Sequence, residues 1–503
     1  MIYPSREEFS KLAQQGNLIP VFSEVIADME TPVSAYYKIN KNPDSNLLSK
    51  YSFLLESVEG GENIARYSFI CSDLHSLFIQ SKGVAKLISD FEEEIIEGKD
   101  IFDKLNNVLK RYNPVEIKDL PPNIGGAVGY ASYDVVSEIE KSVIAPSMEA
   151  IEDVPEAVFM ITDSFLVFDK VKHTIKVISQ AYLDKNSNID EVYDSAVNKI
   201  NNIIKKLKTS ITVPPVKIPE KIETLEFSSN KTKTEYCDMV EKTKQYIMDG
   251  DIIQAVISQR FSIESKTNPL ALYRSMRIVN PSPYMFLLNC KDFAVVGASP
   301  EVNVKCIDRK INVRPIAGTR KRGIDFAEDS KLEKELLDDP KEKAEHIMLV
   351  DLGRNDIGRI AKSGTVEVDQ LMIVEKYSHV MHIVSDVVGI LDEKYESDSV
   401  MRSTFPAGTL SGAPKVRAMQ IISEQEKEKR GPYGGTVAYY SFNGNVDSCI
   451  TIRTAVIKDD KVYIQAGGGI VADSVPETEY EETLNKAKAA MRAVSMSESF
   501  KID

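Results

Sequence analysis

The stretch CITIRTAVIKDDKVYIQA, from Cys449 to Ala466, decides the fold class. Two runs of alternating and β-branched residues, expected as strands at 449–457 and 461–468, flank a short polar segment, and this pattern predicts a β-hairpin. Other strands also follow one another directly, as YMFLLNC at 284–290 and FAVVGAS at 293–299 do. Regular strand–helix alternation is missing, so we expect an α+β protein with antiparallel sheets rather than a doubly wound fold.

The composition describes a large globular chain. With 503 residues and 43% hydrophobic side chains, two to four domains are expected. A formal net charge of −14 argues against a general nucleic-acid or anionic-membrane binder. No signal peptide opens the chain, and no run approaches the roughly 20 apolar residues that span a bilayer. The 5 cysteines are scattered and never spaced C-x-x-C, so we expect reduced thiols in a cytoplasmic protein.

A boundary is expected between two halves of the chain. Residues 205–232 are rich in Lys and Pro and lack apolar periodicity, which indicates a linker or surface crossover. We therefore expect domains at 1–220 and 221–503. An amphipathic helix at 190–208 precedes the boundary, and a helix at 234–251 follows it.

Two acidic pairs lie on predicted helices. In PETEYEETLNKA, Pro476 suits a first helical turn, and Glu479 and Glu482 face a side of small residues while Glu481 joins a polar stripe. Glu342 and Glu345 follow Pro340 in the same three-residue spacing. The ordinary interpretation is that these glutamates are solvated or form salt bridges, which for Glu345 would be to Arg354 or Arg359. The alternative is a shared site for a hard cation such as magnesium, because no Cys or His pair accompanies the carboxylates.

Two glycine-containing segments and one histidine are candidates for chemistry. Gly467, Gly468 and Gly469 leave a strand toward the acidic helix, and FPAGTLSGAPK at 405–415 offers small residues, hydroxyls and a lysine. Both segments suit an anion, and ordinary turns are the alternative. GGAVGY at 125–130 lacks dinucleotide-fingerprint spacing and indicates packing. His382 lies in an alternating apolar strand, as either a satisfied core residue or an acid or base.

Taken together, five motifs resemble the large subunit, component I, of anthranilate synthase. They are LLES at 54–57 with ARYSF at 65–69, RPIAGTR at 314–320, EHIMLVDLGRND at 345–356, FPAGTLSGAPK at 405–415, and AGGGIVADSVPETEYEE at 466–482. The resemblance extends from about Tyr51 to Arg492. It implies two large antiparallel sheets packed face to face with helices outside. It also implies conversion of chorismate and ammonia into anthranilate and pyruvate with Mg²⁺, under inhibition by tryptophan.

The resemblance also implies residue roles. His382 would transfer a proton, with Thr409 nearby. Glu345 and Glu482 would bind magnesium directly, and Glu342 and Glu479 would support them. Chorismate would be bound by Gly318, Thr319, Tyr433, Arg453, Gly467, Gly468, Gly469 and Lys486. Two positions distinguish relatives: Ala317 stands where enzymes making aminodeoxychorismate carry lysine, and Gln254 stands where enzymes using water carry a lysine base.

A regulatory tryptophan site is implied where the two halves meet, the N-terminal domain contributing one side of it. Its residues would be Glu56, Ser57, Pro283, Tyr284, Met285 and Cys449, and Cys71 departs from the usual glycine nearby. The chain carries no glutaminase domain, so ammonia is expected from a separate glutaminase subunit in a heterotetramer, or from solution. Three other readings remain open: a non-catalytic tryptophan sensor, a dinucleotide-binding enzyme and a calcium-dependent structural protein.

Overall fold

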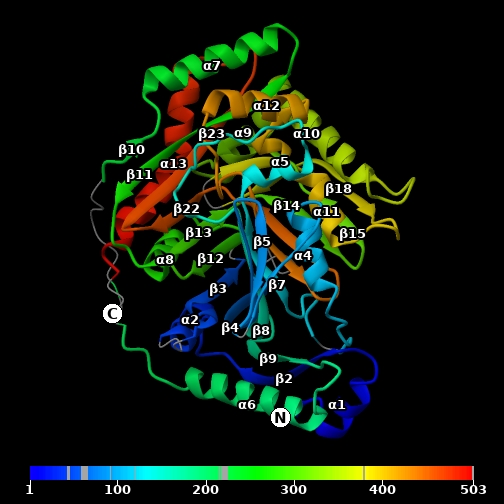
Figure 1. Cartoon of the computed structure of the whole chain (residues 1–503). Helices are drawn as coiled ribbons and strands as arrows, with labels where there is room; N and C mark the ends of the chain where they lie inside the picture. The colour runs from blue at the N-terminus through cyan, green and yellow to red at the C-terminus, as the bar shows by residue number, and fades with distance from the viewer. Residues whose placement is uncertain are drawn as a thin grey trace.

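The computed structural model describes residues 1–41, 46–57, 66–90, 92–118, 120–213, 216, 225–377 and 380–500. Its strands join into one continuous antiparallel network, which bends back on itself into facing layers with the helices outside (Figure 1). The α+β class expected from the paired strands is therefore confirmed. Part of the expected linker, and the ARYSF residue Ala65, lie outside the described residues.

The first layer is built mainly from the second half of the chain. It runs through β11 (Gln254–Glu264), β23 (Lys461–Ile470), β22 (Thr454–Lys458), β13 (Phe293–Ser299) and β12 (Tyr284–Cys290). The hairpin predicted from the opening stretch is β22 with β23, in which Ala455 pairs with Ile464. This layer continues into β3 (Tyr51–Glu56) and β4 (Tyr67–Ser81) of the N-terminal half.

The second layer crosses between the halves again. From β4 it passes through β8 (Ala157–Asp169) to β7 (Gly126–Ala131), which pairs with β20 (Thr436–Ser441). It then runs through β21 (Val446–Ile450), β14 (Val302–Ile307), β15 (Lys310–Val313) and β18 (Val380–Ile390). Strands β16 (Ile316–Lys321) and β17 (Glu367–Lys376) both pair with β18. Two strand pairings, β3 with β12 and β7 with β20, thus join the segments before and after residue 220.

Two local expectations differ from the structure. The strand expected at 449–457 is broken, because β21 ends at Ile450 and β22 begins at Thr454. Between them Arg453 has a φ of +52°, a conformation that a non-glycine residue rarely adopts. The strand expected at 461–468 is longer than predicted: β23 runs to Ile470, so Gly469 also stays in the strand instead of leaving toward the acidic helix, and Gly468 pairs with Ile257 of β11. Pairing with a neighbouring strand here outweighs the flexibility of glycine.

The helices that carry the acidic pairs begin as the sequence predicts. In α10 (Pro340–Gly358) the Asp339 side chain caps the first turn by accepting from the backbone N–H groups of Lys341 and Glu342. Pro476 opens α13 (Pro476–Ser497), which packs against β23, α8 (Pro269–Val279) and α7 (Lys233–Met248). In contrast, α10 packs against β16 and β18 of the second layer, so the two acidic pairs come from helices on different layers.

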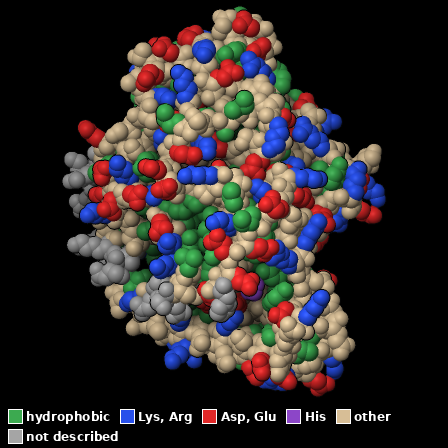
Figure 2. Space-filling view, viewed as in Figure 1, with side chains coloured by type: hydrophobic (Ala, Val, Ile, Leu, Met, Phe, Trp, Pro, Cys, Tyr) green, Lys and Arg blue, Asp and Glu red, His purple; other side chains and the backbone are tan. Residues whose placement is uncertain are grey.

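The remaining helices and the surface have ordinary features. Amphipathic α6 (Ile189–Leu207) covers β9 (Thr174–Tyr182), which pairs with β8. In β7 a Cβ at Gly129 would lie 1.8 Å from the carbonyl oxygen of Val158, so GGAVGY serves close packing as predicted. Among the described residues no helix is both long and apolar enough to cross a membrane. Acidic and basic side chains are interspersed on the face in Figure 2, around a hollow where hydrophobic side chains gather.

Candidate active site and a second cavity

A cavity of about 370 Å³ opens between β16, β18, β23 and α13. The structure brings seven of the predicted catalytic and substrate residues into its wall: Thr319, His382, Thr409, Tyr433, Arg453, Gly467 and Lys486. Ala317 also lines it. Gly318, Gly468 and Gly469 do not line it and lie directly behind its wall. A cavity of this size, mostly apolar with a few convergent polar groups, has the form of a small-molecule site.

His382 is held in one tautomer. Its Nδ1 lies 3.0 Å from the Thr319 hydroxyl and 3.0 Å from the carbonyl oxygen of Gly318; because the carbonyl can only accept, this pair of contacts favours a proton on Nδ1. Gly318 turns this carbonyl toward the ring from a bulge in β16, with a φ of +62°. Burial lowers the pKa of His382 below its usual 6.5. The ring is therefore neutral at physiological pH, with a lone pair on Nε2 that is suited to act as a base.

Glu301 is a buried acid in the same wall, and the sequence analysis did not identify it. It follows β13 at the end of FAVVGASPE. Burial raises its pKa to about 7, and a hydrogen bond of 2.8 Å donated by the hydroxyl of Thr409 partly offsets that rise. A carboxyl group poised near neutral pH can donate a proton and recover it. The available signal was a carboxylate directly after an uninterrupted apolar strand.

Arg453 supplies positive charge to the cavity. It occupies the break between β21 and β22, and its backbone at φ +52° differs from that of a continuous strand. Among the described residues no carboxylate forms an ion pair with Arg453, and burial lowers the pKa of its guanidinium. An arginine without a carboxylate partner inside a cavity is suited to bind an anionic ligand.

Tyr433 and Lys486 complete the polar wall around β23. A Cβ on Gly467 would lie 3.0 Å from the hydroxyl of Tyr433, so glycine is what allows this close approach. The ammonium group of Lys486 donates to the carbonyl of Gly467 at 3.0 Å and pairs with Glu482 at 2.7 Å. Burial raises the pKa of Tyr433, so its hydroxyl stays protonated and can donate to an anion.

The four predicted metal-binding glutamates lie on α10 and α13 beside this cavity. Glu345 is half-buried, and burial followed by the charge of Glu342 raises its pKa. Burial and the charge of Glu482 likewise raise the pKa of Glu479, although a hydrogen bond from Ser474 opposes them. A carboxylate whose pKa is raised by burial and by a second carboxylate favours a bound cation. The chemistry of this all-oxygen donor set fits Mg²⁺.

Basic side chains hold these carboxylates in the present conformation. Arg320 donates to Glu342 at 2.9 Å, and Lys486 pairs with Glu482. In the part of the chain that the structure describes, no three Asp, Glu, His or Cys side chains are arranged to hold one metal ion. Glu345 does not pair with Arg354, which binds Asp351 instead.

The two positions that distinguish relatives lie on different sides of the cavity wall. Ala317 contributes a methyl group to the cavity. Gln254 is set back: it hydrogen-bonds Glu345, and its amide nitrogen would lie 2.3 Å from a Cβ on Gly469. Gly469 therefore makes room for Gln254, and Gly468 for Glu479, whose Oε2 would lie 3.0 Å from a Cβ there.

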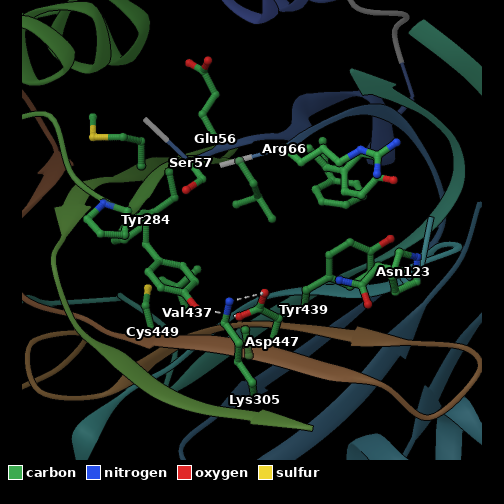
Figure 3. Close-up of a pocket in the computed structure, with 18 of the residues that line it drawn as sticks. Glu56, Ser57, Arg66, Asn123, Tyr284, Lys305, Val437, Tyr439, Asp447 and Cys449 are labelled. Carbon is green, nitrogen blue, oxygen red and sulfur yellow. Dashed lines mark hydrogen bonds and ion pairs between the residues drawn. The ribbon is translucent and has the colours of Figure 1, made fainter. Parts of the chain in front are cut away.

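A second cavity, of about 490 Å³, lies between the two halves of the chain (Figure 3). All six residues predicted for a regulatory ligand contribute to its wall: Glu56, Ser57, Pro283, Tyr284, Met285 and Cys449. Aromatic residues Tyr67, Phe69, Phe286 and Tyr439 complete much of the remainder. Pro283 also lines the first cavity, so the two share a wall.

The charged groups of the second cavity are not placed as the motif alone suggests. The Glu56 carboxylate points out of the cavity in Figure 3, and it accepts hydrogen bonds from the Tyr273 hydroxyl at 2.7 Å and from Nη2 of Arg277 at 3.3 Å. Asp447, which the sequence analysis did not identify, does face the cavity, where it accepts from Tyr284 at 2.8 Å and pairs with Lys305 at 3.4 Å. Cys71 is buried on β4 opposite Phe53 and does not line the cavity.

Comparisons with known proteins agree on one family. The model for chorismate binding enzymes matches residues 52–492. Anthranilate synthase component 1 of Aquifex aeolicus is 46% identical over 98% of both chains, and that of Acetivibrio thermocellus is 47% identical over 98% of this chain and 99% of the relative. The crystal structure of anthranilate synthase component I from Streptococcus pneumoniae is 34% identical, with a TM-score of 0.77 over 93% of this chain and 99% of that one. The menaquinone-specific isochorismate synthase of Escherichia coli, 17% identical with a TM-score of 0.69 over 97% and 98%, shares the fold.

Proposed function

Because the chain belongs to the anthranilate synthase component 1 family of chorismate binding enzymes, we propose that its first cavity converts chorismate and ammonia into anthranilate and pyruvate. One observation carries this proposal: a guanidinium without a carboxylate partner, Arg453, shares the cavity with a neutral histidine, His382, and a buried carboxyl group, Glu301. Chorismate is a dianion with a hydroxyl leaving group and an acidic ring proton. Each of these features has a matching protein group.

The groups proposed to bind chorismate lie around β23 and the break between β21 and β22. Arg453 and the Tyr433 hydroxyl hold the enolpyruvyl carboxylate by charge-assisted hydrogen bonds. Lys486, Thr319 and the backbone of Gly467 shape the rest of the pocket, and Gly318 orients His382 through its carbonyl. A Cβ at Gly467 would collide with the carbonyl of Ile257 at 2.7 Å, so only glycine allows this wall to lie so close to the ligand. Binding the ring in one orientation is a large part of catalysis by positioning.

Proton transfer is assigned to two residues. As ammonia adds at C2, the protonated carboxyl of Glu301, oriented by Thr409, gives its proton to the departing C4 hydroxyl, which leaves as water. His382 Nε2 then accepts the C2 proton while the C3–O bond of the enolpyruvyl group breaks. The enolate that leaves takes up a proton and becomes pyruvate. The ring becomes aromatic, which makes the last step favourable.

Magnesium is proposed as the metal. Glu345 and Glu482 would hold it directly, with Glu342 and Glu479 in support, after Arg320 and Lys486 release the carboxylates they now pair with. The ion would neutralise the ring carboxylate of chorismate and draw electron density from the ring. Burial and a neighbouring carboxylate raise the pKa of Glu345 and that of Glu479, and this supports a cation at this place.

Two positions support ammonia as the nucleophile. Ala317 cannot attack the ring covalently, as a lysine at this position could. Gln254 cannot serve as a base that activates water, because its amide does not accept a proton at physiological pH. We propose that a separate glutaminase subunit supplies the ammonia in a cytoplasmic hetero-oligomer.

The second cavity is proposed to bind L-tryptophan as a feedback inhibitor. Its aromatic and aliphatic wall suits an indole ring, and its volume lies in the range of small-ligand sites. Because Glu56 turns toward Tyr273 and Arg277, Asp447 is the carboxylate that faces the cavity and can meet the α-ammonium group. The wall shared through Pro283 supports communication with the first cavity.

Chromatographic identification of the product tests the reaction. The purified chain is incubated with chorismate, Mg²⁺ and excess ammonium, and the products are separated and weighed by mass spectrometry. Anthranilate with an equal amount of pyruvate is expected. Isochorismate or aminodeoxychorismate as the main product would overturn the proposal, and so would unchanged chorismate with folded protein.

A further inference from the structure

Behind the first cavity lies a fully buried ion pair that the proposed reaction does not use. Arg430 and Glu426 have side-chain exposures of 1% and 6%. Nε and Nη2 of Arg430 donate to the two carboxylate oxygens at 2.8 and 2.6 Å, in a fork. Removing two charges from water carries a large desolvation penalty. A well-packed pair of apolar side chains at the same place often gives the folded protein as much stability as the buried ion pair does. The arrangement therefore calls for a reason besides stability.

The other donors of Arg430 reach the cavity wall. Nη1 donates at 2.7 Å to the carbonyl of Leu410, and Nη2 donates at 2.6 Å to the carbonyl of Val256. Leu410 closes the turn η3 (Gly408–Leu410), whose central residue is Thr409. Thr409 in turn donates to Glu301. One guanidinium thus fixes the backbone immediately beside the residue that orients the proposed acid.

Arg430 also faces the substrate-binding tyrosine. Its guanidinium carbon lies 5.7 Å from the centre of the Tyr433 ring and 4.5 Å from that of Tyr133. Tyr133 belongs to η2 (Tyr133–Val135) in the N-terminal half. The neighbouring Asp134 accepts from the backbone N–H groups of Arg430 at 3.2 Å and Gly431 at 2.7 Å. The segment that leads to Tyr433 is therefore held from both halves of the chain.

Glu426 extends the same network to the glycine strand. Its Oε1 accepts from the backbone N–H and the hydroxyl of Ser258, at 2.8 and 2.9 Å. Ser258 pairs with Gly467 across β11 and β23. The ion pair thereby links three parts of the cavity wall: η3, the segment 430–433 before β20, and β23.

We propose that Arg430 is a positioning residue, which fixes Thr409 through the Leu410 carbonyl and Tyr433 through its ring face. The inference rests on the proposed function only for its assay. Arginine is needed because its planar fork serves a carboxylate and two carbonyls at once, and a lysine ammonium cannot cover all three directions. In Arg430→Lys the hydrogen bond to the Leu410 carbonyl is lost, whereas the lysine ammonium still neutralises the charge of Glu426.

The test compares Arg430→Lys with Arg260→Lys. Arg260, on β11, pairs with Glu428 at 2.6 Å, two residues before Arg430; among the described residues its side chain has no hydrogen bond or ion pair with a residue proposed for binding or catalysis. We expect Arg430→Lys to lower kcat for anthranilate formation about 30-fold with KM for chorismate within about threefold, and Arg260→Lys to change neither by more than about threefold. A kcat within threefold of the parent chain in Arg430→Lys would overturn the inference.

A double-mutant cycle separates positioning from general destabilisation. In a Thr409→Val background, Arg430→Lys should lower kcat less than threefold further, because the loss in kcat is attributed to Thr409 and the lysine keeps a positive charge beside the Tyr433 ring. Fully multiplied losses would overturn the inference. If Arg430→Lys does not fold, Glu426→Gln replaces it with the same expected non-additivity, since it weakens the fork without removing it. Failure of the parent chain to form anthranilate would instead count against the proposed function.

Discussion

The hydroxyl of Thr409 lies 2.8 Å from the carboxylate of Glu301, and it joins the turn between two helices to the end of a core strand. Thr409 comes from FPAGTLSGAPK and Glu301 from FAVVGASPE, more than 100 residues earlier. This contact orients a carboxyl group whose pKa burial raises to about 7. The acid of the proposed reaction is thus defined by folding and not by a local motif.

Glu301 should control the alkaline side of the pH profile. As an acid it must be protonated, so kcat should fall as the pH rises through about 7. Glu301→Gln keeps the size of the side chain and removes the acidic proton. We expect kcat to drop at least about 100-fold and the alkaline decrease of kcat to disappear. Steady-state anthranilate fluorescence between pH 5.5 and 9 measures both the rate and the position of this alkaline limb. A variant with the parent rate and pH profile would contradict the assignment.

His382 should control the acidic side. As a base it must be neutral, and burial lowers its pKa below 6.5, so the limb should lie below that value. His382→Gln should reduce kcat by about 100-fold or more while chorismate still binds. Rapid-quench detection of an aminated intermediate would locate the defect, because loss of the base stalls proton removal after ammonia has added. Unchanged turnover would contradict this role.

The acidic helix offers a matched pair of variants. Glu482→Gln should raise the Mg²⁺ concentration for half-maximal activity at least about tenfold, because a direct ligand is lost. Glu481→Gln is the control: its side chain is 58% exposed and 3.7 Å from Lys233, and the Mg²⁺ dependence should not change. Mg²⁺ titrations of anthranilate formation compare the two. Equal Mg²⁺ dependence in both variants and the parent would argue against Glu482 as a ligand.

Tryptophan binding can be followed without labels, because the chain contains no tryptophan. Fluorescence excited at long ultraviolet wavelength then arises from the ligand alone. Tyr284→Leu removes one aromatic side of the second cavity and the hydrogen bond to Asp447, so the affinity for L-tryptophan should fall about tenfold or more. Tyr246→Leu, on α7 with its hydroxyl bonded to Glu424, should leave it unchanged. No saturable signal with the parent chain would contradict the regulatory proposal.

The sequence predicted strands better than it predicted the local geometry of the site. The hairpin of β22 and β23 follows from alternation and a polar turn, which are local properties. The break at Arg453 does not, since TIRTAV has the pattern of an uninterrupted strand. Only tertiary contacts hold Arg453 at φ +52°, where its backbone carbonyl accepts from the N–H of Ala298 at 3.2 Å.

Long-range contacts also explain what was missed at both cavities. Glu301, Asp447 and Arg430 carry no spacing signal, because their partners lie on distant segments. Gly469 was expected to leave the strand, since glycine is favoured in loops, yet pairing with β11 keeps Gly467 to Gly469 together in β23. Their role is to allow close approach of Tyr433, Glu479 and Gln254, which only the folded chain reveals.

The most direct test of the central claim uses Arg453. The parent chain and Arg453→Gln are each given chorismate, Mg²⁺ and saturating ammonium, and anthranilate fluorescence is recorded across chorismate concentrations. We predict anthranilate from the parent chain, and in Arg453→Gln a kcat/KM lower by about 10 to 100-fold, the value of a charge-assisted hydrogen bond to a carboxylate. Equal kcat/KM in both proteins would show that the chorismate carboxylate binds elsewhere and would contradict the account.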